Sequence, residues 1–153
     1  MKLPIYQVDA FTDQLFKGNY AAVVPVPHAI SPELMQQIAT ENNLSETAFV
    51  LELAKDHYQI RWFSPVTEID FCGHATLAAA YVLFQREAVN SLRFSTLKVG
   101  DLSVVQGQDG WLEMNFPQRP AMNRSGQCAS DPLSQSSPPS PVHSTRRPLD
   151  WSA

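Results

Sequence analysis

The chain has 153 residues, of which 44% are hydrophobic and 17% are charged, so it can bury a core of the size expected for one domain. Its formal net charge of −4 disfavours electrostatic binding to nucleic acid or to an anionic membrane surface. No apolar run reaches the roughly 20 residues that a membrane-spanning helix needs, and two cysteines are too few for a secreted disulfide framework. We therefore expect a cytoplasmic protein that binds neither nucleic acid nor membranes.

The first part of the chain predicts two strands and a helix. Apolar and polar residues alternate over residues 5–11, and residues 21–26 form a short apolar run that proline ends. A helix is expected to follow Ser31, whose side chain can cap it. Pro32 suits the first helical turn, and Glu33 suits the positive end of the helix dipole.

The second part predicts five strands and one apolar helix. Residues 75–87 have almost no polar face until Gln85, and a helix that is apolar all round must be buried all round. Strands before and after it should therefore curl around it. We predict an α+β fold, a mixed curled sheet around one central helix, rather than a doubly wound sheet. The expected strands cover residues 46–53, 58–64, 91–97, 101–108 and 111–116.

The composition changes after Pro117. Residues 118–153 are rich in serine and proline, and their few large apolar side chains are isolated. Such a segment buries too little surface to offset the entropy lost on ordering. We expect a folded half-domain over residues 1–117 and a disordered tail over residues 118–153. Two interpretations of the tail stay open: a natural extension, or a reading frame that has departed from a longer protein near residue 118.

The stretch DFCGHATLAAAYVLF, residues 70–84, contains a candidate anion site at the start of the apolar helix. The first turn of a helix presents unpaired N–H groups and a partial positive charge, so it can hold a carboxylate or a phosphate. Gly73 lets a ligand approach the backbone closely. A thiol near a helix N-terminus has a lowered pKa, so Cys72 could act as a base or nucleophile. His74 could move protons near neutral pH.

Structural interpretations of the same residues stay open. Cys72 can be a small buried apolar residue, and His74 can be a structural hydrogen-bonding residue. Asp70 can cap the helix or remain a solvated acid. A zinc site that combines Cys72 and His74 with Cys128 and His143 is disfavoured, because the two distant ligands lie in the tail and the spacing matches no structural zinc pattern. We therefore expect no metal.

Glu46, in the stretch ENNLSETAFV, is a second candidate for chemistry. It enters an apolar strand close to Phe49 and Val50, where its carboxylate would be partly desolvated. Desolvation raises a carboxyl pKa toward the range in which the group exchanges protons with a carbon acid. The alternative is an exposed glutamate at the start of a strand, which caps the chain or pairs with a lysine.

Three segments resemble, in order and spacing, the N-terminal half of the PhzF family: VDAFTDQLFKGNYAAVV, IATENNLSETAFV and IRWFSPVTEIDFCGHATLAAAYVL. This family comprises phenazine-biosynthesis-type isomerases related to diaminopimelate epimerase, and the resemblance covers about residues 5–117. It implies two similar halves, each a sheet curled around a central helix, with the active site between them. It also implies cofactor-independent proton transfer on a small carboxylate substrate such as dihydro-hydroxyanthranilate, in a biosynthetic pathway.

The resemblance also implies roles for individual residues. Glu46 matches the catalytic acid/base of the family, and His74 matches its active-site histidine. Gly73 and the amides after it match the carboxylate-binding helix end. Cys72 lies where the related epimerases carry a catalytic cysteine, whereas PhzF members often have a small residue there. The residues implied to bind substrate are Asn19, Cys72, Gly73, Ala75 and Thr76.

The chain departs from the family pattern in two places. Tyr20 replaces the proline that is common in GNPAAV, and residues 118–153 contain no counterpart of the Asp-Pro-x-Thr-Gly-Ser motif of the second half. Two hypotheses follow. The chain is a PhzF-like isomerase, or it is a truncated, inactive half-fold, either a binding or interaction protein or a fragment without function. The face that the second half normally covers would favour a homodimer.

Overall fold

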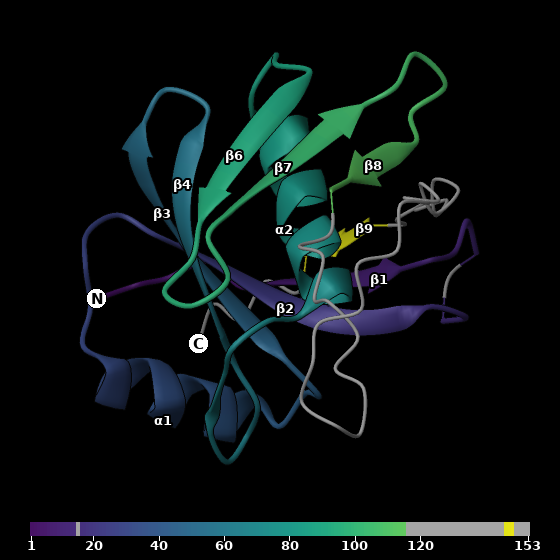
Figure 1. The fold of residues 1–153 in the computed structure, drawn as a ribbon. Helices are drawn as coiled ribbons and strands as arrows, with labels where there is room; N and C mark the ends of the chain where they lie inside the picture. The colour runs from purple at the N-terminus through teal and green to yellow at the C-terminus, as the bar shows by residue number, and fades with distance from the viewer. Residues whose placement is uncertain (15, 116–145, 149–153) are drawn as a thin grey trace, which may run out of the picture.

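The computed structural model describes residues 1–14 and 16–115, together with the backbone of residues 146–148. These residues form one sheet, in the order β8-β7-β6-β4-β3-β2-β1-β9 with β5 attached to β4, and two helices (Figure 1). The helices are α1 (Pro32–Asn42) and α2 (Gly73–Arg86). The strands are β1 (Tyr6–Ala10), β2 (Asn19–Val26), β3 (Thr47–Ala54), β4 (His57–Phe63), β5 (Glu68–Ile69), β6 (Ser91–Ser95), β7 (Asp101–Gln106), β8 (Leu112–Met114) and β9 (Arg146–Pro148).

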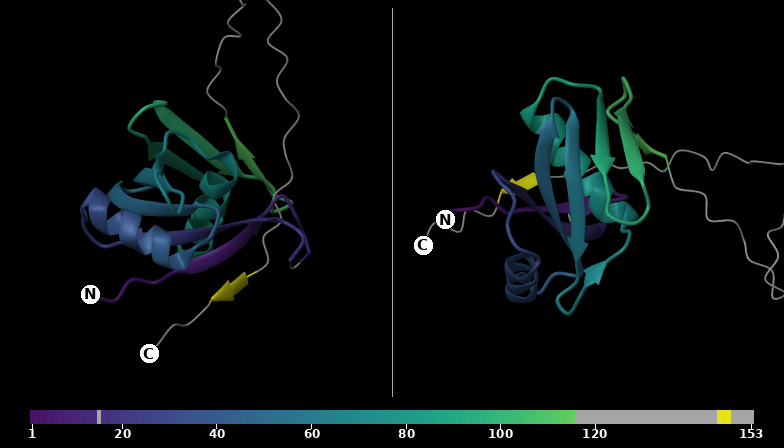
Figure 2. Two further views of the ribbon diagram at one scale, coloured as in Figure 1. Left: turned by 90° about the horizontal axis from the view of Figure 1, so that it is seen from below. Right: turned by 60° about the vertical axis from the view of Figure 1, so that its left-hand side comes forward.

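The connections between strands place the two helices on opposite faces of the sheet. β2 and β3 are parallel and are joined through α1, whereas β4 and β6 are parallel and are joined through α2. Both crossovers move the chain in the same direction along the sheet, but β3 and β4 are antiparallel. Crossovers of the same hand therefore place their helices on opposite faces, as Figure 2 shows.

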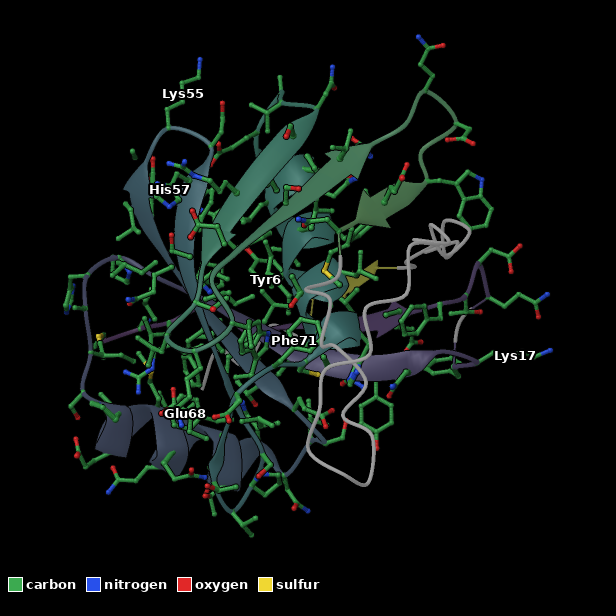
Figure 3. The ribbon with its side chains drawn as sticks, in the orientation of Figure 1. Tyr6, Lys17, Lys55, His57, Glu68 and Phe71 are labelled. Carbon is green, nitrogen blue, oxygen red and sulfur yellow. The ribbon has the colours of Figure 1, made fainter. Side chains whose placement is uncertain are left out.

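Helix α1 covers the outer, convex face. Met35 and Ala39 pack there against a small apolar cluster that includes Phe49 of β3 and Phe63 of β4. The predicted cap is confirmed, because Ser31 Oγ accepts a hydrogen bond from the Leu34 N–H at 3.2 Å. Two lysines lie at turns between strands. Figure 3 shows Lys17, between β1 and β2, and Lys55, between β3 and β4, pointing away from the sheet.

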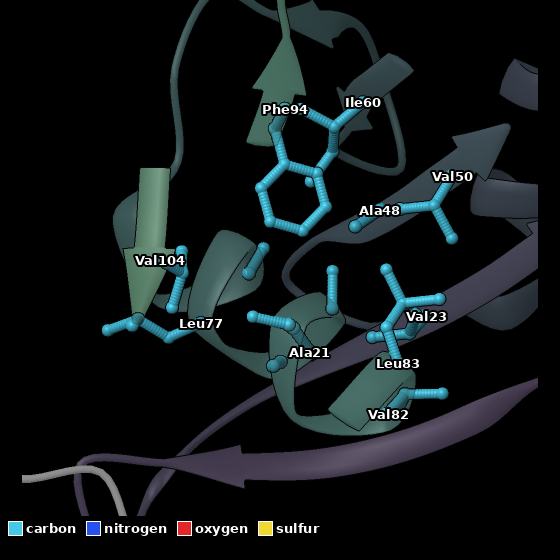
Figure 4. Close-up of a cluster of buried hydrophobic side chains, with 14 of the residues drawn as sticks. Ala21, Val23, Ala48, Val50, Ile60, Leu77, Val82, Leu83, Phe94 and Val104 are labelled. Atoms are coloured by element: carbon cyan, nitrogen blue, oxygen red, sulfur yellow. The ribbon is translucent and has the colours of Figure 1, made fainter. Parts of the chain in front are cut away.

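Helix α2 lies in the concave face, where the sheet curls around it. It contacts β1, β2 and β3 on one side and β7 and β8 on the other. Residues 75–80 and 82–84 of α2 are buried. Figure 4 shows Leu77, Val82 and Leu83 in one apolar cluster with side chains of the strands, among them Val23 and Val104. The predicted fold, a mixed sheet curled around a central apolar helix, is confirmed.

The structure differs from the sequence prediction at a few boundaries. Helix α2 begins at Gly73, two positions before the predicted start, and β5 was not predicted. The predicted tail, residues 118–153, lies outside the described residues, except that the backbone of Arg146–Pro148 forms β9 and pairs with β1. In the described part of the chain, neither helix is long and apolar enough to cross a membrane.

Candidate active site

Glu46, Cys72 and His74 meet at the N-terminal end of α2. Glu46 directly precedes β3, Cys72 is the N-cap of α2, and His74 is the second residue of the helix. Glu46 Oε2 lies 2.8 Å from His74 Nε2, and Cys72 Sγ lies 3.3 Å from His74 Nδ1. The structure therefore brings together the two residues predicted to be catalytic, which are far apart in the sequence, and places the cysteine beside them.

The edge of β2 holds Glu46 in place. The Ala22 N–H donates a hydrogen bond to the Glu46 carbonyl at 2.9 Å, and Ser45 Oγ donates to the Tyr20 carbonyl at 3.1 Å. The parallel pairing of β2 with β3 begins one residue after Glu46, where Ala22 lies opposite Thr47. Because β2 also packs against α2, these bonds hold Glu46 at the N-terminal end of α2.

The connection from β4 to α2 positions His74. β5 folds back on β4, and Arg61 bonds both carboxylate oxygens of Glu68 through Nε and a terminal nitrogen, at 2.7 and 2.8 Å. The rings of Trp62 and Phe71 meet edge to face, with centroids 5.9 Å apart. These contacts lead the chain from β4 to the start of α2, where His74 is the second residue.

The first turn of α2 narrows the set of groups that a ligand can reach. The Thr76 N–H and the Thr76 hydroxyl both donate to the Cys72 carbonyl, at 3.1 and 2.7 Å. Ala75 and Thr76 are fully buried, whereas Gly73 and His74 are partly exposed. Thr76 therefore closes the helical turn. Gly73 and His74 are the residues of this turn that a ligand can approach from solvent.

Burial sets the state of Cys72. The residue is 8% exposed, and burial raises the pKa of its thiol to about 11. The backbone amides of Ala75 and His74 act in the opposite direction, and the charge of Glu46 adds to the effect of burial. The thiol is therefore protonated at neutral pH. The prediction of a lowered pKa at the helix end is wrong, and the interpretation of Cys72 as a small buried residue holds.

Two other residues singled out from the sequence lie outside this cluster. Asp70 is exposed and forms an ion pair with Lys98 at 3.1 Å, so it is a solvated acid and not the cap of α2. Asn19 is exposed at the first position of β2, opposite Ala10. It directly precedes Tyr20, whose carbonyl bonds Ser45, so the backbone of Asn19 is close to the Glu46 segment.

The comparisons with known proteins agree with the fold. The family model for phenazine biosynthesis-like proteins, PhzC-PhzF, matches residues 8–137. The chain belongs to this family. It is 52% identical over 119 residues to a Pseudomonas aeruginosa protein named an uncharacterized isomerase. Among solved structures, a PhzF family protein of Enterococcus faecalis superposes with a TM-score of 0.69 at 45% identity. A PhzC/PhzF protein of Clostridium difficile superposes with a TM-score of 0.68 at 49% identity.

The chain spans less than half the length of these PhzF relatives. The match to the Pseudomonas protein covers 76% of this chain but 45% of that protein. The two structural matches each cover 74% of this chain, and 44% and 43% of the longer chains. The structure thus corresponds to one half of the family fold, in agreement with the resemblance of residues 5–117 to its N-terminal half.

Proposed function

We propose that this PhzF family chain is the half of an isomerase that carries the general acid/base residue. Glu46 takes a proton from one carbon of a small carboxylate substrate and returns it to another. The observation that carries this proposal is the 2.8 Å contact between Glu46 Oε2 and His74 Nε2 at the start of α2. The relationship to a protein named an isomerase supports it.

The burial of the pair suits proton transfer to and from carbon. The side chains of Glu46 and His74 are 21% and 12% exposed, so each is largely shielded from bulk water but still in reach of a ligand from solvent. A general base must come within hydrogen-bonding reach of the proton that it removes. His74, next to the carboxylate, binds or polarises the substrate on the same side.

The helix end supplies the binding site for the substrate carboxylate. The amides of Gly73 and His74 lie at the positive end of α2, where an anion is stabilised without a cationic side chain. Cys72, Ala75 and Thr76 belong to the same helix end and complete this binding site. We also assign Asn19, the first residue of β2, to substrate binding. The thiol of Cys72 takes no part in the proton transfer.

The proposed reaction moves a proton and leaves the electron count of the substrate unchanged, so it needs no redox cofactor. We place the protein in the cytoplasm, in a biosynthetic pathway, acting on a small molecule and not on nucleic acid or membranes. A homodimer would cover the face of this half that the longer relatives fill with their other half.

The test is to incubate the purified 153-residue chain in D₂O with a panel of small unsaturated carboxylic acids and to follow deuterium at carbon by NMR. The proposal predicts label at a carbon next to the double bond in at least one acid. No label in any acid, from a chain that is folded by circular dichroism, would support the alternative of an inactive half-fold that serves as a binding protein.

A further inference from the structure

We propose that Glu46, Cys72 and His74 form a binding site for one divalent transition-metal ion, with zinc as the preferred ion. One ligand atom from each residue, a carboxylate oxygen, Sγ and a ring nitrogen, lies within 4.8 Å of the other two. The site assignment stands on this geometry alone. Its consequence, that the ion blocks the acid/base pair, rests on the proposed function.

The distances between the three groups are close to those of a tetrahedral site. His74 Nε2 lies 2.8 Å from Glu46 Oε2 and 3.9 Å from Cys72 Sγ. Zinc binds nitrogen, oxygen and sulfur at about 2.0–2.3 Å, which separates tetrahedral ligand atoms by roughly 3.3–3.7 Å. Small rotations of the three side chains would open the first distance and shorten the second. Three protein ligands leave a fourth position for water.

A buried oxygen without a partner points to a ligand between these groups. Among the described residues, Glu46 Oε2 is buried and has no hydrogen-bond partner, although His74 Nε2 is 2.8 Å away. His74 Nδ1 lies 3.3 Å from Cys72 Sγ. When Nδ1 carries the ring proton, the unprotonated Nε2 lies 2.8 Å from a carboxylate oxygen that accepts no hydrogen bond. Two electron-pair donors are then close together, and a cation bound between them would stabilise both.

The donor set selects a borderline-soft ion. Carboxylate, imidazole and thiolate together suit zinc better than magnesium or calcium, which prefer oxygen ligands. Binding forms a metal–sulfur bond, breaks the S–H bond of Cys72 and releases that proton to solvent. The carboxylate and the thiolate then balance the charge of the dication, so the complex is neutral in a partly buried place.

This site differs from the zinc site considered from the sequence. Spacing suggested only a combination of Cys72 and His74 with the tail, and we expected no metal on that ground. The fold brings a third donor, Glu46, from a separate segment. No local ligand spacing contains this combination, because 28 positions separate Glu46 from His74.

The test is a titration of the purified metal-free chain with Zn²⁺ in competition with a chromophoric chelator, and with Co²⁺ followed by absorption. We expect one ion per chain and a cobalt–thiolate charge-transfer band. Cys72→Ser should abolish that band and weaken Zn²⁺ binding by about 100-fold or more, since even outer-shell changes cost 10–100-fold. Glu46→Gln should also weaken it. Cys128→Ser and His57→Ala, the matched controls, should change neither result.

Three results would overturn the site: no stoichiometric binding, binding that is insensitive to Cys72→Ser and Glu46→Gln, or loss of the cobalt band in Cys128→Ser. The titration uses no substrate, so it is independent of the proposed isomerase. If the ion binds as expected but the metal-free chain never incorporates deuterium, the isomerase proposal fails and the metal site stands. If both hold, one equivalent of Zn²⁺ should stop the incorporation.

Discussion

At the residue scale, Cys72 shows two opposing effects on one thiol. The N-terminus of α2 directs the amides of Ala75 and His74 at the sulfur, which lowers the thiol pKa, whereas burial raises it. Burial has the larger effect, so the pKa moves from 9.0 to about 11. A cysteine next to a glycine and a histidine at a helix start therefore need not be reactive.

This state of Cys72 predicts a pH profile for alkylation. In a Cys128→Ser variant, in which Cys72 is the single cysteine, iodoacetamide should react slowly at pH 7. Because only the thiolate reacts, the rate should rise by about tenfold per pH unit and level off only near pH 11. The rate can be measured by mass spectrometry on the metal-free protein. A rate that levels off below pH 8 would show that the pKa of Cys72 is lowered and that its thiol is reactive at neutral pH.

Glu46 shows at the same scale what the sequence could and could not predict. The resemblance of SETAF and CGHAT to family motifs singles out Glu46 and His74. Their contact depends on a parallel pairing of β2 with β3 and on the packing of α2 against β2, which are long-range features. The opposite roles of Gly73 and Thr76, one partly exposed and the other buried, likewise follow from where α2 begins.

At the scale of elements, α2 was predictable because its residues are almost all apolar, which requires the helix to be buried. Its run of alanine and leucine admits no solvent-facing side, so both a helix and an enclosing sheet follow from it. β5 was not predictable, because two residues carry no periodicity. Its pairing with β4 depends instead on the Arg61–Glu68 ion pair and on the return of the chain toward α2.

Truncation of Leu77 tests how far the sheet depends on α2. Leu77 is 1% exposed in the central cluster, so Leu77→Ala should lower the free energy of unfolding by about 2–5 kcal/mol. Leu97 is 59% exposed, so the same substitution there should change stability by about 0.5 kcal/mol or less. Urea unfolding of the two variants measures both values. Equal losses in the two variants would contradict a core centred on α2.

The bond between Tyr58 and Glu87 ties the end of α2 to β4. The Tyr58 hydroxyl donates to Glu87 Oε1 at 2.5 Å, and burial together with this carboxylate raises the pKa of Tyr58 well above its ordinary value. Tyr58→Phe leaves the carboxylate without this donor and should cost about 1–3 kcal/mol of stability in urea unfolding at pH 7. The matched control Tyr20→Phe alters a tyrosine that is 43% exposed and should cost about 0.5 kcal/mol or less. Equal, small costs would show that the bond does not stabilise the fold.

At the scale of the whole molecule, one half of a longer fold carries both the residue proposed to move the proton and the histidine proposed to bind the substrate. The chain covers 45% of the length of its Pseudomonas relative, yet Glu46, His74 and the end of α2 all lie within the described residues. The half therefore contains the residues proposed for proton transfer and for anion binding, and the Glu46 and His74 side chains remain partly exposed. We expect proton exchange without the full shielding from water that a second half or a second copy would add.

The most direct test of this account compares deuterium incorporation by the wild-type chain with that by two glutamine variants. Glu46→Gln removes the proposed proton carrier and should lower the rate by about 10²–10⁴-fold. Glu41→Gln, at an exposed position of α1, should leave the rate unchanged. A loss confined to Glu46→Gln is the result that the account predicts. Equal incorporation by the wild type and both variants would contradict it.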